Sequence, residues 1–144
     1  MSLDSLIEDG SIHPFKATPQ EISRSMEIAH RDLNEAERIL AETLDWSYSI
    51  AYNAVLQACR AYMFHRGYRA ASFEAHKATL AFMLVSVDVK LKESMDYFDR
   101  VRKKRHRVVY DEVGLVSEKE AQQLILKARE FITWVDAQVK KTSG

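Results

Sequence analysis

Residues 18–40, TPQEISRSMEIAHRDLNEAERIL, decide the fold class of this chain. Thr18 can cap a helix, Pro19 suits the first helical position, and Glu21 stands where a capping box needs it. Apolar residues then recur at alternating spacings of four and three, which places them on one face of a helix: Ile22, Met26, Ala29, Leu33, Ala36 and Leu40. The pattern predicts an amphipathic helix over about 19–43.

The same reasoning predicts four more helices along the chain. They lie near 46–66, 73–87, 88–110 and 118–140. The helix near 46–66 is apolar on most sides, which is typical of a central, buried helix. No segment of any length alternates apolar and polar residues with period two, so no strand is predicted.

Capping residues set the expected helix ends. Asp45 and Ser72 can cap the second and third helices, and Gly67 is placed to end the second. Ser117 and Glu120 form a second capping box before the last helix. Short connections between long helices imply antiparallel neighbours, so we expect an all-α, up-and-down four-helix bundle with a fifth, shorter helix. Residues 1–17 are expected to form an N-terminal arm, and residues 18–141 the bundle.

Composition gives no overall attraction to nucleic acid or membrane. The chain has 144 residues and a formal net charge of zero, so any electrostatic function must come from local clusters. Cys59 has no partner for an internal disulfide and suits a reducing compartment. The first ten residues lack the features of a signal peptide, and no apolar run approaches the roughly 20 residues that cross a bilayer. We expect a cytoplasmic protein without membrane contact.

One such cluster is the segment RVRKKRHR, residues 100–107, which holds six of the 21 Lys and Arg residues. At about 100° per residue, Arg102 and Arg105 fall inside the apolar arc of their own helix. That arc is formed by Leu91, Met95, Phe98, Val101, Val108 and Val109. An unpaired charge at such a position is costly. The two arginines therefore either extend to solvent or pair with a carboxylate, or they line a cleft where an anion binds.

The whole run also suits contacts to a phosphate backbone, through Arg102, Lys103, Lys104, Arg105 and Arg107. The alternative is a solvated helix face whose charges pair with acidic residues, such as Glu35, Glu37 or those at 118–120. The five histidines are scattered, and no paired cysteines or HExxH motif occur, so neither a metal nor a cofactor is predicted.

Three stretches together resemble the HEPN superfamily over roughly residues 20–140. Residues 102–111, RKKRHRVVYD, are similar to its fourth-helix motif, and residues 29–36, AHRDLNEA, to its first helix. Residues 48–68, with AYNA and a terminal RGY, resemble the second helix of one branch. Each motif is loose, and their order and spacing carry the resemblance.

The resemblance implies a helical bundle that forms a homodimer along the motif helix. In active members, an Arg and a His separated by four to six residues, from each subunit, form a site that cleaves RNA without metal. Many members are toxins of toxin–antitoxin pairs. Their partner is often a minimal nucleotidyltransferase, which can modify a Tyr near the motif.

Carried onto this sequence, the resemblance assigns catalytic positions to Arg105, His106 and Tyr110. Tyr110 stands where many members have the His, and tyrosine, with a usual pKa of about 10, is a poor general base at neutral pH. A second register pairs Arg100 with His106, although Arg100 falls on the solvent side of the helix. Two functions are therefore expected: an RNA- or nucleotide-binding protein with or without ribonuclease activity, or a non-catalytic module that partners a nucleotidyltransferase.

Overall fold

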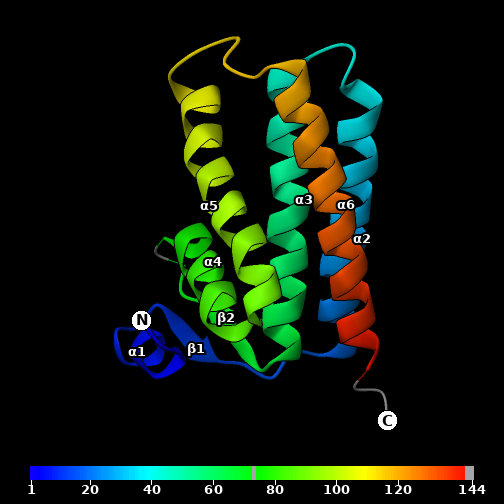
Figure 1. Ribbon diagram of the computed structural model, residues 1–144. Helices are drawn as coiled ribbons and strands as arrows, with labels where there is room; N and C mark the ends of the chain where they lie inside the picture. Colours follow the sequence, from blue (N-terminus) through cyan, green and yellow to red (C-terminus); the bar gives the residue numbers. More distant parts are fainter. Residues whose placement is uncertain (73, 142–144) are drawn as a thin grey trace.

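The computed structural model describes residues 1–72 and 74–141, which form six helices and two short strands (Figure 1). In chain order these are α1 (Leu3–Glu8), β1 (Ile12–Pro14), α2 (Pro19–Ile39), α3 (Leu44–His65), β2 (Tyr68–Ala70), α4 (Ala75–Ser86), α5 (Val89–Tyr110) and α6 (Glu118–Lys140).

The four long helices α2, α3, α5 and α6 run alternately up and down, and α4 is the shorter fifth (Figure 1). Helix α3 packs against α2, α6, α5 and α4, so it lies at the centre of the bundle. This confirms the predicted all-α bundle with a fifth, shorter helix, and its most buried helix is the one that is apolar on most sides. Helix α4 covers only the lower half of α3 and α5 (Figure 1).

Both predicted capping boxes are present. The Glu21 N–H donates to Thr18 Oγ1 over 3.1 Å, and the Thr18 N–H donates to Glu21 Oε1 over 3.0 Å. Ser117 and Glu120 make the same reciprocal pair at the start of α6. These bonds satisfy backbone donors that a helix leaves free in its first turn.

Two predicted caps are wrong. Helix α3 is capped by Thr43, whose Oγ1 accepts from the Trp46 N–H, because Asp45 is used elsewhere. Asp45 Oδ2 accepts from the N–H of Gly114 over 2.8 Å and so ties the α5–α6 loop to the start of α3. Ser72 does not cap α4, because Glu74, in the left-handed region at φ 50°, occupies the N-cap position. Residue 73, the predicted start of this helix, lies outside the described residues.

The predicted absence of strands is also wrong. Strands β1 and β2 pair antiparallel, with Ile12 opposite Ala70 and Pro14 opposite Tyr68. Three residues per strand are too few to show a period-two pattern. Gly67 ends α3, as predicted, and its φ of 93° turns the chain directly into β2. The segment expected to be an arm thus carries α1 and β1, and α1 packs against α4.

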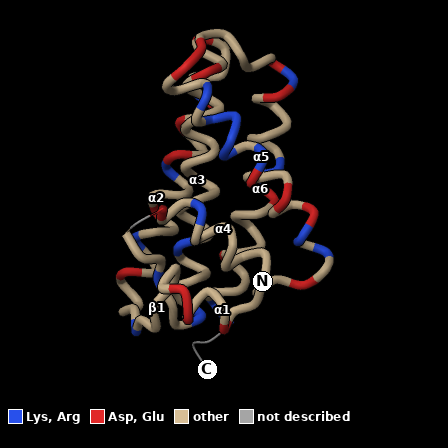
Figure 2. The backbone as a smooth tube through the Cα atoms, turned by 90° about the vertical axis from the view of Figure 1, so that its left-hand side faces the viewer, with Lys and Arg blue, Asp and Glu red and all other residues tan. Residues whose placement is uncertain are grey.

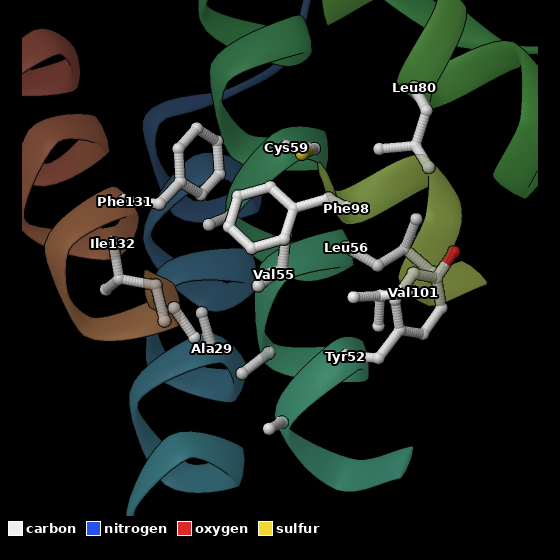
Figure 3. Packing of buried hydrophobic residues seen from close by; sticks show 14 of the residues in the cluster. Ala29, Tyr52, Val55, Leu56, Cys59, Leu80, Phe98, Val101, Phe131 and Ile132 are labelled. Carbon is white, nitrogen blue, oxygen red and sulfur yellow. The ribbon is translucent and has the colours of Figure 1, made fainter. Parts of the chain in front are cut away.

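The core fills the space between the helices and is mainly apolar. Phe98 of α5 is completely buried, and its ring lies 5.5 Å from that of Phe131 of α6 (Figure 3). Cys59 is also completely buried, and burial raises the pKa of its thiol. None of the helices in the described part of the chain combines the length and apolar character that a membrane crossing requires.

Candidate functional site

The predicted site residues lie on α5, and buried apolar side chains anchor this helix in the bundle. Asp88 caps it by accepting from the Leu91 N–H, and Met95, Phe98, Val101 and Val108 are buried. Lys and Arg positions follow the upper half of this helix, with Asp and Glu positions close by (Figure 2). The arginines at 102 and 105 interrupt the buried face.

Arg102 and Arg105 are both half-buried, and within residues 1–72 and 74–141 only Arg102 has a carboxylate partner. The Arg102 Nε donates to Asp99 Oδ1 over 2.9 Å. The Arg105 Cζ lies 5.7 Å from the ring centroid of Tyr52 on α3, a cation–π arrangement. Its Nε is buried and has no hydrogen-bond partner among the described residues. Arg105 is therefore a cationic group that the chain leaves incompletely paired.

Two residues that the sequence did not point to complete the surroundings of Arg105. Tyr52 is completely buried, its hydroxyl has no hydrogen-bond partner in the described part of the chain, and burial raises its pKa (Figure 3). The ring of His76 on α4 lies 6.0 Å from the Tyr52 ring. Partial burial, followed by the charges of Arg105 and Arg102, lowers the pKa of His76. Tyr52 belongs to an apolar helix and His76 is isolated in sequence, so only the packing of α3, α4 and α5 shows them together.

His106 and Tyr110 lie together on the exposed flank of α5. Their ring centroids are 4.9 Å apart, and Tyr110 is 68% exposed. If Arg105 is set at zero, Arg102, His106 and Tyr110 follow at roughly 60°, 100° and 140° around the axis. These four residues, hereafter the α5 flank, form an arc from the edge of the core to solvent. Arg100 of the second register is exposed and lies over Tyr97 instead.

The other three predicted phosphate contacts are each paired with a carboxylate. Lys103 Nζ lies 3.6 Å from Asp99 Oδ2, and Arg107 donates to Glu112 over 3.2 Å. Lys104 donates to Glu120 of α6, and this bond is the main reason that the pKa of Glu120 is lowered. Lys104 is half-buried, whereas Lys103 and Arg107 are exposed. Pairs of exposed side chains contribute about 0–1 kcal/mol, so at Lys103 and Arg107 a phosphate can replace the carboxylate at little cost.

No metal centre emerges from the described residues. Within residues 1–72 and 74–141, no three His, Cys, Asp or Glu side chains are grouped so that they could hold an ion.

Substitution of Arg105 by methionine is expected to raise the pKa of His76, because Arg105 lowers that pKa more than Arg102 does. The pKa should stay below the usual 6.5, since burial is the first cause of the shift. A histidine with a lowered pKa binds its proton more weakly in the folded chain, so stability should be lost as the pH falls from 6.5 through the folded pKa. An NMR titration of the ring protons measures this pKa.

Lys103→Met is the control for that titration, because it removes one exposed charge from the same helix. A His76 pKa that moves equally in both variants would mean that Arg105 does not face His76.

Comparisons with known proteins agree with the fold. Residues 22–138 match the HEPN domain family. The structure is similar to the crystal structure of ST0689, an archaeal HEPN homologue, with a TM-score of 0.63 and 18% sequence identity. The similarity covers 82% of this chain and 97% of that chain. No curated protein sequence matches this chain. Since the family match spans most of the chain, this protein belongs to the HEPN family.

Proposed function

We propose that this HEPN protein binds RNA or a nucleotide as a homodimer, through a groove lined by the α5 flank of each subunit. The observation that carries the proposal is Arg105, whose buried Nε has no partner among the described residues. A buried donor without a partner costs about 1–3 kcal/mol, and more when the group is charged. A phosphate oxygen would accept from the remaining N–H groups of this half-buried guanidinium and neutralise its charge.

The rest of the α5 flank suits the same ligand. Arg102 adds a second guanidinium, 25% exposed, whose bond to Asp99 uses Nε and leaves donors for a phosphate. The exposed rings of His106 and Tyr110 offer a surface on which a base can stack. Lys103 and Arg107 would then attract the backbone through charge that salt screens.

The surface of α5 that α4 leaves uncovered supports the proposed dimer. The upper half of α5 has no helix over its α4-facing side (Figure 1), and HEPN domains commonly dimerize. A twofold axis beside α5 would bring two copies of Arg105 and Arg102 to one groove. Sedimentation at micromolar concentration is expected to give twice the 16.6 kDa mass of one chain. A species of 16.6 kDa alone at that concentration would contradict the proposed groove.

Cleavage by this groove would need no metal. Arg105 would stabilise the charge that develops on the phosphorane as the bond from phosphorus to the 2′-oxygen forms and the bond to the 5′-oxygen breaks. His106 would position the attacking 2′-hydroxyl and take up its proton, and His106 or Tyr110 would protonate the leaving 5′-oxygen. The second candidate function is a non-catalytic module that partners a minimal nucleotidyltransferase in a toxin–antitoxin pair. It is favoured by the exposure of Tyr110, since a modified residue must be accessible.

Tyr110→Phe separates the two functions. Labelled RNA is incubated with wild type and variant in excess chelator, and binding and product are measured separately. A ribonuclease that uses the phenol should bind equally and lose turnover by about 10²-fold or more, the scale of general acid catalysis. A partner module should give no product with either protein, and only the wild type should be modified by a nucleotidyltransferase. Cleavage that survives the substitution would exclude Tyr110 from the chemistry.

A further inference from the structure

A second set of cationic groups surrounds a cavity of about 460 Å³ beside the lower half of α3. Its walls come from the start of α4, from β2, from Phe15 just after β1, and from one face of α3. The α3 residues are spaced by three and four along that face: Asn53, Leu56, Gln57, Arg60, Met63 and Phe64. The volume lies in the range of small-molecule sites.

Two guanidiniums are held at this cavity by aromatic rings. Arg60 Cζ lies 5.4 Å from the ring centroid of Phe64, and Arg69 Cζ lies 5.5 Å from that of Phe15. The two rings are themselves 5.2 Å apart, so they join the arginines into one cluster. Because a flat guanidinium on a ring keeps its N–H donors at the edge, both arginines remain able to bind an anion.

Few acidic side chains line the cavity, so the charges of these two arginines are not neutralised there. Neither Arg60 nor Arg69 forms an ion pair in the described part of the chain. Glu21 is the one acidic residue among the described lining residues, and its Oε1 already accepts from the Thr18 N–H. The first residues of α4, Ala75 and His76, also line the cavity, and a helix amino end adds partial positive charge.

A buried acceptor lies on the same face of α3 as Arg60, one turn away. Gln57 Oε1 is buried and has no hydrogen-bond partner among the described residues. Asn53, on the same face of α3, gives its amide N–H to Asp32 and keeps its carbonyl oxygen as an acceptor. Two amide oxygens call for N–H donors from a ligand, and Leu56 and Met63 beside them suit an apolar or planar body.

We propose that this cavity binds a small organic anion that carries a phosphate or carboxylate at one end and an N–H donor on a planar body. Arg60 and Arg69 hold the anionic group, and Gln57 Oε1 accepts from the N–H. The site lies within one chain and uses none of the α5 flank residues, so it does not depend on the function proposed above.

Calorimetric titration of the full chain tests the site with three probes. Adenosine 5′-monophosphate and 4-aminobenzoate each join an anion to an amine on a planar ring. Adenosine differs from its monophosphate only in lacking the phosphate. At least one anionic probe is expected to bind, with adenosine weaker by roughly tenfold or more, as expected for the loss of a charge-assisted contact. The phosphate and carboxylate arms show which anion the cavity takes, and either supports the proposal.

Single substitutions then locate the bound probe. Arg60→Met and Arg69→Met are each expected to lower the affinity for the anionic probe by about tenfold or more. Both variants keep an aliphatic side chain against the aromatic ring. Gln57→Leu should lower the affinity for both adenosine and the anionic probe, because the substitution removes the acceptor for their amine. Arg129→Met is the matched control, since it removes an exposed guanidinium from α6, which does not line the cavity.

Three results would overturn the proposal. They are no binding of either anionic probe at millimolar concentration, an affinity for adenosine equal to that for the anionic probe that binds, or a loss of that probe's affinity in Arg105→Met but not in Arg60→Met. The last result would place the probe on the α5 flank. Conversely, if Arg105→Met leaves RNA binding intact while Arg60→Met abolishes probe binding, the α5 proposal fails and this one stands.

Discussion

Arg105→Met is expected to give a protein that is more stable and binds RNA less tightly. The substitution removes a buried Nε that has no partner among the described residues, an arrangement that costs about 1–3 kcal/mol. It also removes the cation–π contact with Tyr52, which contributes about 0.5–1 kcal/mol. The difference favours the variant by about 1 kcal/mol in the free energy of unfolding. RNA or nucleotide binding should weaken by roughly 1.5–3 kcal/mol, the scale of a hydrogen bond to a charged group.

A rise in stability together with a fall in RNA affinity distinguishes a binding residue from a structural one. Lys103→Met serves as the control, because it removes one positive charge from the same helix at an exposed position. The control should reduce affinity much less, and its effect should fade as salt is added. Urea denaturation and fluorescence anisotropy with a labelled RNA provide the two measurements. If Arg105→Met unfolds the protein and wild type shows no RNA binding, the arginine is structural and the proposed function fails.

Phe98→Ala is expected to have the largest effect on stability, a loss of about 3–5 kcal/mol in the free energy of unfolding. The Phe98 ring is completely buried and packs near Phe131 of α6 and Tyr97 of α5, so its removal leaves a cavity between two helices. Phe98 also lies one turn before Arg102, so it anchors the part of α5 that carries the flank. Thermal or urea unfolding followed by circular dichroism measures the loss.

A matched substitution on the same helix shows whether burial is the cause. Val89 is 82% exposed at the start of α5, so Val89→Ala should change the stability by less than about 0.5 kcal/mol. Phe98→Leu should fall between the two, since it keeps much of the apolar volume. A loss below about 1 kcal/mol for Phe98→Ala would mean that α5 is held by other contacts.

The long helices could be predicted from sequence because each shows the 3.6-residue period over several turns. Helix α1 and the strands β1 and β2 could not, because six or three residues contain too little of either period. The cap of α3 was predicted wrongly at Asp45, because Thr43, two residues earlier, accepts from the helix amino end instead. The deciding factor is the bond from Gly114, which lies 69 residues away and recruits Asp45.

For the candidate site, the periodicity predicted which face of α5 holds Arg102 and Arg105, but not what that face meets. In the sequence, Tyr52 could not be distinguished from its apolar neighbours on α3. His76 stands apart from the other histidines and from any motif, so nothing in the sequence marked it as a site residue. The cavity near Arg60 was beyond prediction for a stronger reason. Its walls meet only because β1 pairs with β2, which brings Phe15 beside Phe64 across some fifty residues of chain.

Because Cys59 is buried, the reactivity of its thiol reports when the helix bundle opens. The thiol is the single one in the chain, it lies in the second half of α3, and its burial hinders both reagent access and ionisation. A maleimide or disulfide reagent should therefore react only when α3 separates from its neighbours. When reclosing is faster than the reaction, the labelling rate gives the equilibrium population of open molecules, measured without denaturant and under any buffer condition.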